Sequence, residues 1–303
     1  LIENFNIQDL QKLVVRIKPS NLKTYLLNNL NSGEIEKILI NVKLDENSNI
    51  YDYQVNGSVK KVNVKVFDGL SIKNVNLNFI SDKNLTLINS ISANYQGISI
   101  SNGSTSLMRN KEIRIEGKFN SQFNLNEDAV NKLLAKLNIK FLERNKVKAQ
   151  GSLLHKFLFT IDENFKLIDY EYKSNGSVSE SQIILKDVFK SSFVEKQIRK
   201  ITISKTNLEV NLNKKNKNLL TIDGLYNLGF SENKKFRITN NLNRKNSKYL
   251  IDFDLAENIF LELINFKTNN KNKSNIKSEI NFTENNIIFN NINFTEGKNS
   301  ISI

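Results

Sequence analysis

A two-residue alternation of apolar and polar side chains restricts the fold of this chain more than any other feature. Val62, Val64 and Val66 alternate with lysine and asparagine. The segment Val75–Phe79 repeats the pattern, and polar stretches such as Asp45–Asn49 separate one alternating segment from the next. A period of two places every second side chain on the same face of a β-strand. The chain is therefore predicted to be mainly β, as a long antiparallel meander with one apolar and one polar face.

Two helical segments interrupt this alternation. One helix is predicted over Pro19–Leu30, with Ser20 as its N-cap and Gly33 as the residue that ends it. An amphipathic strand, Ile38–Leu44, follows it directly. A second helix is predicted over Asn126–Leu142, where an asparagine cap precedes two acidic residues and an apolar stripe. The chain thus uses a helix followed by strands at least twice.

This repeat predicts two helix-plus-meander units, over residues 1–125 and 126–303, that form one continuous surface rather than separate domains. Residues 1–18 are predicted to be extended or irregular, with Leu13 in strand phase. The segment 187–201 fits either a strand or a third short helix, because its apolar residues suit both periods.

The tripeptide Asn-Gly-Ser occurs three times, beginning at Asn56, Asn102 and Asn175. It matches the acceptor pattern for N-glycosylation, and Asn-Gly is also the strongest short signal for a hairpin turn. We interpret all three as turns between strands.

The composition disfavours nucleic acid as a partner. The formal net charge is +13 in 303 residues, and the excess comes almost entirely from lysine spread over polar strand positions and loops. Specific nucleic-acid recognition favours arginine and stacking aromatics on a defined patch. Solvated lysine faces are the simpler interpretation, and membrane headgroups are the anionic partner that remains open. Cysteine is absent, which removes disulfides and thiolate metal sites.

The chain is not expected to be an enzyme, and no metal or cofactor is predicted. His155 is the one histidine, in phase with apolar neighbours, and it suggests a sheet-face residue or a pH-sensitive contact. Asp252 and Asp254 alternate with apolar residues, so a solvated face is simpler than a cation site. The glycines are isolated between strands, which disfavours a phosphate-binding loop.

A meander of this length must do something with its apolar face, because a flat sheet would leave that face exposed. The sheet could fold into a sandwich, close into a barrel, or curl into a groove that binds an apolar ligand. The repeat favours the elongated groove, with two or three short helices. Its predicted lining is the set of in-phase apolar residues Ile38, Ile40, Val42, Leu44, Val62, Val64, Val66, Val75, Leu77, Phe79, Ile113, Ile115, Phe157 and Phe159.

The helix, glycine and strand of Pro19–Leu44 resemble the repeat opening of the AsmA-like superfamily, particularly its YhdP-type members and more loosely the TamB-like ones. The glycine-spaced strands of Ile91–Gly103, and the second start at Asn126–Leu142 followed by Gly151, are similar to that family as well. The resemblance implies a taco-like β-groove in the periplasm of a Gram-negative cell envelope. Such a groove shields phospholipid acyl chains during transport between the inner and outer membranes.

The same resemblance implies that this chain is an internal fragment whose parent is anchored in the inner membrane outside the fragment. Its implied partners are phospholipid and, in outer-membrane biogenesis, proteins of the outer membrane. The alternative from the residue pattern alone is a structural or adhesive extended β-protein, whose core is filled by its own side chains and which binds no ligand.

Overall fold

The computed structural model has two helices and eighteen strands in the part of the chain that it describes. These residues are 1–302 without 15–27, 66–70, 137–144, 165, 192–193, 216–217, 230–231, 243–245, 257, 259, 262–265, 269–271 and 284–285. In this part of the chain, no helix is long and apolar enough to span a membrane.

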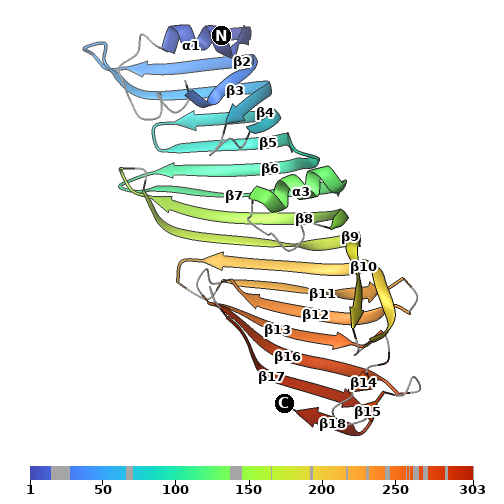
Figure 1. The fold of residues 1–303 in the computed structure, drawn as a ribbon. Helices are drawn as coiled ribbons and strands as arrows, with labels where there is room; N and C mark the ends of the chain where they lie inside the picture. The colour runs from blue at the N-terminus through green and yellow to red at the C-terminus, as the bar shows by residue number, and fades with distance from the viewer. Residues whose placement is uncertain are drawn as a thin grey trace. The chain divides into compact units, whose positions relative to one another are not determined.

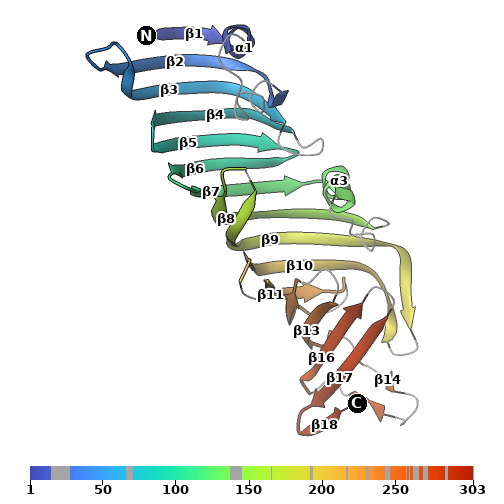
Figure 2. The same ribbon diagram turned by 90° about the vertical axis from the view of Figure 1, so that its left-hand side faces the viewer.

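Sixteen strands form one antiparallel sheet in which each strand pairs with the next one along the chain (Figures 1 and 2). They are β1 (Ile2–Asn6), β2 (Leu30–Leu44), β3 (Ile50–Lys65), β4 (Ser71–Asp82), β5 (Leu85–Tyr95), β6 (Ile98–Arg109), β7 (Ile113–Leu125), β8 (Lys146–Ile161), β9 (Leu167–Ser191), β10 (Val194–Asn213), β11 (Leu219–Asn227), β12 (Lys234–Asn241), β13 (Asn246–Asp254), β16 (Ser274–Thr283), β17 (Ile287–Glu296) and β18 (Asn299–Ser302). A separate hairpin joins β14 (Phe260–Leu261) to β15 (Phe266–Lys267). The predicted mainly-β meander is confirmed.

The chain divides into two compact units, which we describe separately. Unit 1 comprises Leu1–Gln122 with Leu154–Tyr172, and unit 2 comprises Phe123–Leu153 with Lys173–Ile303. The sheet is open, with β1 and β18 at the two ends of the strand order. In neither unit is it closed or strongly curled, so strand curvature does not build the walls of a deep groove.

The strand register keeps the apolar residues of unit 1 on one face despite several bulges. Ile35 pairs with Val59, and Val59 pairs with Leu77. Between Val59 and Val62, β3 has two residues where β4 has one, so Val62 returns to the same face and pairs with Val75. Lys61, one of the two residues in this bulge, has a φ of 52°.

The helix α1 (Ile7–Val14) covers one end of this apolar face. Its Ile7 forms a core with Ile35 and Val62, and all three side chains are at most 4% exposed. The prediction that residues 1–18 are extended or irregular was therefore wrong for Ile7–Val14, including Leu13, and Val15 onward lies outside the described residues. The segment is helical because the helix buries Ile7 against two strands. The alternation of residues within the segment itself gives no sign of this contact.

The two predicted helices have different outcomes. Most of the predicted Pro19–Leu30 helix lies outside the described residues; residues 28–29 are helical, and β2 begins at Leu30. Gly33 therefore lies inside a strand and does not end a helix. Its φ is 148°, and a β-carbon there would lie 2.8 Å from the Cα of Val62.

The second helix is confirmed as α3 (Glu127–Lys136), and the rest of its predicted range lies outside the described residues. Asn126 caps it, because its Oδ1 accepts a hydrogen bond of 3.0 Å from the Ala129 amide. The segment 187–201 is extended in its described residues, which belong to β9 and β10.

The predicted Asn-Gly turns were wrong at all three positions, because each lies inside a strand. Gly57 pairs with both Ile38 and Phe79, and a β-carbon on Gly57 would lie 2.6 Å from Phe79 Cζ. Gly103 accommodates the side chain of Ile91 in the same way. These glycines make room for a large side chain of the neighbouring strand.

Unit 2 has its own apolar face, built around a row of paired residues. Across β11 to β18 the register aligns Gly224, Phe236, Phe253, Ile276, Phe294 and Ile301. The Phe236 and Phe253 rings stack at 5.7 Å, and β15 places Phe266 edge-on to Phe294 at 5.6 Å. The β14–β15 hairpin therefore lies against part of this face.

Candidate functional site

The candidate site is the apolar face of unit 1, the side of the sheet onto which α1 packs. Register places nine predicted lining residues on this one face, across three strands. They are Ile38, Ile40, Val42, Leu44, Val62, Val64, Val75, Leu77 and Phe79. Val66 lies outside the described residues.

The remaining predicted lining residues lie on β7 and β8. A β-carbon on Gly117 would lie 2.6 Å from Thr105 Oγ1 and from Phe157 Cζ, so Gly117 and Phe157 share the face of Thr105. Thr105 pairs with Ile88, which in turn pairs with Phe79 on the apolar face. Two-residue alternation along β7 and β8 adds Ile113, Ile115 and Phe159 to the same face.

Exposure divides the apolar face into a covered part and an open part. Ile35 and Val62 are buried beneath Ile7, so Val62 belongs to a packed core rather than to an open lining. Further along β2, Ile40 is 50% exposed, Val42 44% and Leu44 55%. We call these three residues, with Tyr53 and Val55 opposite them on β3, the open strip.

The opposite face of the same strands is polar. On β2 and β3, Asn41 pairs with Gln54 and Lys43 with Asp52, and Lys43 Nζ lies 2.9 Å from Asp52 Oδ2. Apolar residues also occur on this polar face, and Leu39, Ile80 and Leu87 are all partly exposed there. The sheet of unit 1 is therefore amphipathic, and its lysines lie largely on the solvated side.

His155 lies on the apolar face in a network that crosses three strands. Its Nε2 is 2.7 Å from Ser121 Oγ on β7, and its Nδ1 is 2.7 Å from Tyr172 Oη on β9. The ring stacks on Phe119 at 4.4 Å, and burial lowers the pKa of the imidazole. Both ring nitrogens are occupied and Ser121 is itself buried, so this is a satisfied sheet-face histidine.

Sequence reasoning identified His155 but missed its partners. Ser121 follows Phe119 by two residues, and that phase was a signal available in β7. Nothing in the sequence indicated Tyr172, because its contact depends on the β8–β9 register.

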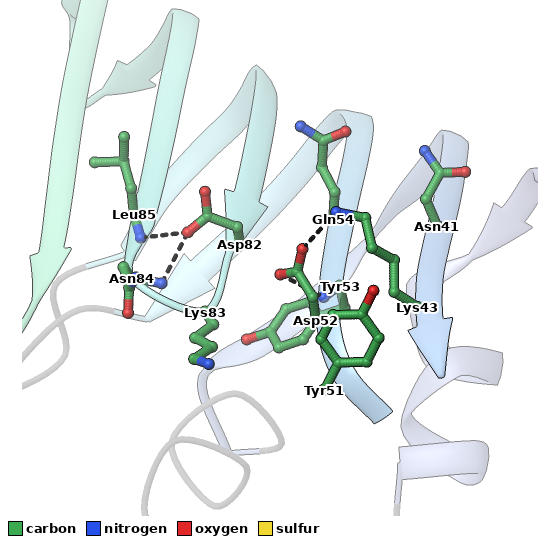
Figure 3. A pocket seen from close by; sticks show the side chains of 10 residues that line it. All are labelled: Asn41, Lys43, Tyr51, Asp52, Tyr53, Gln54, Asp82, Lys83, Asn84 and Leu85. Carbon is green, nitrogen blue, oxygen red and sulfur yellow. Dashed lines mark hydrogen bonds and ion pairs between the residues drawn. The ribbon is translucent and has the colours of Figure 1, made fainter. Parts of the chain in front are cut away.

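A polar pocket of about 630 Å³ lies near the strand ends of unit 1, with most of its lining on the polar face of β2 to β4, opposite the open strip (Figure 3). We call it the rim pocket; β2, β3 and the β4–β5 turn supply its lining residues Asn41, Lys43, Tyr51, Asp52, Tyr53, Gln54, Asp82, Lys83, Asn84 and Leu85. Sequence reasoning did not find it, because it forms only where two separate hairpin ends meet.

Two carboxylates in the rim pocket are held ionised by their hydrogen bonds. Lys43 lowers the pKa of Asp52 chiefly through their hydrogen bond, and Asp52 in turn raises the pKa of Lys43. Asp82 Oδ1 accepts the backbone amides of Leu85 and Asn84, both at 2.8 Å, which lowers the pKa of Asp82. Arg109 donates to the Asp82 carbonyl at 3.2 Å and to Thr86 Oγ1 at 2.7 Å.

The acidic pair predicted on the solvated face of unit 2 lies there with polar partners. Asn275 Nδ2 donates to Asp252 at 2.7 Å and to Asp254 at 3.0 Å, and Lys277 lies 3.4 Å from Asp252. Within the described ranges, no group of three or more histidine and acidic side chains is placed to hold a metal ion.

The chemistry available in unit 1 is therefore that of an amphipathic sheet, with an apolar strip on one face and a charged pocket on the other. Comparison of the chain with protein-family models, with curated proteins and with solved structures finds no match.

Proposed function

We propose that this chain is a lipid-shielding segment, whose open strip and its continuation along the meander cover the acyl chains of phospholipids. The observation that carries the proposal is an amphipathic sheet on whose apolar face none of the described residues forms a second layer over the open strip. Ile40, Val42 and Leu44 remain about half exposed in the part of β2 that extends past its last residue paired with β1, Ile38. Large apolar side chains in such an array are typical of an interaction surface.

The surface area supports this proposal over a self-filled core. The chain exposes 20387 Å² at a mass of 34.9 kDa. A compact monomer of that mass would expose roughly 13,000 Å². A structural β-protein with interdigitated layers would lie near the smaller value, so the excess favours a face that receives something else.

Lipid chains suit such a face energetically. Each methylene that leaves water gains about 0.8 kcal/mol, and covering the exposed half of a residue such as Ile40 gains about 1 kcal/mol more. Neighbouring positions along the strip are similar in chemistry, so an acyl chain could shift between them without re-entering water. No catalytic step is needed, and we propose none.

The resemblance to the AsmA-like superfamily supports a location for this activity. We propose that it operates in the periplasm, on phospholipids moving between inner and outer membranes, in a parent protein anchored to the inner membrane.

The test uses two neighbouring residues of β2 that lie on opposite faces of one strand. Ile40→Asp places a charge in the open strip, and Leu39→Asp places the same charge on the polar face. Both side chains are exposed, so both variants are expected to fold. Native mass spectrometry of gently purified protein should show co-purifying phospholipid in the wild type and in Leu39→Asp, with loss in Ile40→Asp. A lipid-free mass from folded, monodisperse wild-type protein would overturn the proposal and favour the structural alternative.

A further inference from the structure

The strand β2 is longer than the strand that pairs with its outer edge. Its pairing with β1 ends at Ile38, opposite Ile2, whereas β2 continues to Leu44 (Figure 2). We call the segment Leu39–Leu44 the β2 overhang. On its inner edge it pairs with β3. On its outer edge none of the described strands pairs with it, so every second residue there has an amide and a carbonyl without a strand partner in the described part of the chain.

The β2 overhang has few of the features that protect a free strand edge. Its register with β3 runs without a shift from Lys37 to Lys43, and it contains no proline. Its one charged side chain, that of Lys43, is already paired with Asp52 at 2.9 Å. Protected edges are typically short, bulged, charged or interrupted by proline. The β2 overhang is therefore a template for one further strand.

The last long strand of the sheet has a less regular edge. β17 also extends beyond its outer partner β18, whose pairing with β17 covers Asn293–Glu296. A bulge in the unpaired part places Phe289 opposite Ile280 and Asn291 opposite Glu279, so Phe289 and Asn291 lie on different faces. A strand added there would have to repeat the bulge, which a strand added to the β2 overhang does not.

We propose that the β2 overhang pairs with the same segment of a second copy of this chain, antiparallel and about a twofold axis at Val42. In this register Val42 lies opposite Val42 of the second copy, and Ile40 lies opposite Leu44 of the second copy. On the other face Asn41 lies opposite Lys43 of the second copy, so no like charges are directly opposite. Apolar residues meet apolar ones and polar residues meet polar ones, and this self-complementarity selects a second copy as the occupant.

The neighbouring registers are each less favourable. A twofold axis at Lys43 would place two ammonium groups directly opposite each other. An axis between two residues would oppose side chains of different faces, which the pleat does not allow. An axis at Asn41 would bring Leu44 of the second copy opposite Ile38, whose outer edge β1 already occupies. The axis at Val42 avoids all three conflicts.

Pairing in this register joins the open strips of two copies into one continuous apolar surface, with the polar face of each copy on the opposite side. The overlap comprises Ile40–Leu44 of each copy, which is small beside the roughly 20–30 residues a side of a standard interface. The dimer is therefore reversible and depends on protein concentration. The inference rests on strand register and not on the proposed lipid-shielding function, so either can fail without the other.

The first experiment places charge at the twofold axis. Residues directly opposite each other have β-carbons about 5 Å apart, so Val42→Glu and Val42→Lys each bring like charges together. Sedimentation velocity over a range of concentrations should show a monomer–dimer equilibrium for the wild type and dimerisation about tenfold weaker in each variant. An equimolar mixture of the two variants should restore the dimer, because opposite charges then meet.

Tyr53→Glu is the matched control. Tyr53 pairs with Val42, lies on the same face and is similarly exposed, but it is one strand further from the edge. The two copies of position 53 are three strand spacings apart in the dimer, about 14 Å, which exceeds the screening length at physiological salt. Tyr53→Glu should therefore dimerise like the wild type. A wild type that stays monomeric at the highest concentration, or equal weakening by Tyr53→Glu and Val42→Glu, would overturn the inference.

A second experiment determines the register, and it uses the absence of cysteine from the sequence. A disulfide needs two β-carbons about 4 Å apart. Under mild oxidation Val42→Cys should cross-link to itself, whereas Ile40→Cys should cross-link to Leu44→Cys in a mixture and not to itself. Self-cross-linking of Ile40→Cys as fast as that of Val42→Cys would overturn the assigned register. Native mass spectrometry of the wild-type sample separates the two proposals, because phospholipid on a purely monomeric chain would overturn the pairing and leave the lipid-shielding function standing.

Discussion

The close approach of β8 to Gly176 makes this glycine a sharp test of the strand packing. Gly176 lies in the interior of β9, where a β-carbon would collide with the Ser152 carbonyl oxygen and lie 2.8 Å from Leu153 Cα. Both obstacles are backbone atoms of the adjacent strand, so rotation of a side chain cannot relieve the contact. Gly176→Ala must instead displace β8.

The expected cost follows from two opposing terms. Overpacking of this kind destabilises by about 1–3 kcal/mol, at the upper end where backbone has to move. Alanine recovers about 0.5–1 kcal/mol because it restricts the unfolded chain more than glycine does. We therefore expect Gly176→Ala to lower the free energy of unfolding by about 2 kcal/mol.

The assay is urea denaturation followed by far-UV circular dichroism, with two companion variants. Asn175→Ala, next to Gly176 at an exposed position, should leave the midpoint nearly unchanged. Gly57→Ala should cost less than Gly176→Ala, because the atoms nearest its β-carbon belong to the Phe79 ring, which can rotate. A Gly176→Ala protein as stable as the wild type would refute the assigned β8–β9 packing.

Two further predictions concern burial on the apolar face. Because burial lowers the pKa of His155 below 6.5, the unfolded state takes up a proton before the folded state does. Stability should therefore fall as the pH decreases below 6.5, and His155→Phe should remove that part of the pH dependence. A denaturation midpoint that depends equally on pH in the wild type and in His155→Phe would contradict this prediction. Val62→Ala should cost about 1–2.5 kcal/mol through a cavity in the covered part, while Val42→Ala in the open strip should cost less than 0.5 kcal/mol. Equal losses of stability for Val62→Ala and Val42→Ala in thermal denaturation would mean that the open strip is covered.

The alternating segments predicted most of this fold because successive side chains of a pleated β-strand point to opposite faces, which gives the two-residue period directly. The prediction of turns at Asn-Gly was wrong because this short local signal was preferred over the two-residue alternation of the surrounding strand. Tyr53, Val55, Gly57 and Val59 continue the alternation straight through Asn56, and this longer pattern was the better guide. Burial of Ile7 and the contact of Tyr172 with His155 could not be predicted, since each depends on which strands become neighbours.

The lining residues could be predicted, but the rim pocket could not. Ile40, Val42 and Leu44 follow from phase within one strand, whereas the pocket requires Asp82 and Lys83 of one hairpin to approach Tyr51 and Asp52 of another. No periodicity carries that information.

The bulges explain why one apolar face persists along strands of up to sixteen residues in β2 to β6. Successive apolar-face residues are normally two apart, yet Ile35 and Ile38, Val59 and Val62, and Ile88 and Ile91 are three apart. Each spacing of three coincides with a register shift, which adds one residue and returns the next side chain to the same face.

These shifts also mark a physical boundary on β2. Ile35, before the shift, is 2% exposed beneath Ile7, whereas Ile40, beyond it, is 50% exposed. A bulge increases local twist and bends the strand, so a helix as short as α1 that packs before the bend does not follow the strand past it. The same device that keeps the apolar face continuous therefore limits how much of it α1 can cover. On this reasoning the open strip is a consequence of the strand geometry, and removing the β2 bulge by deleting Glu36, the extra residue between the Ile35–Val59 and Lys37–Ser58 pairs, should turn the apolar residues beyond it to the polar face.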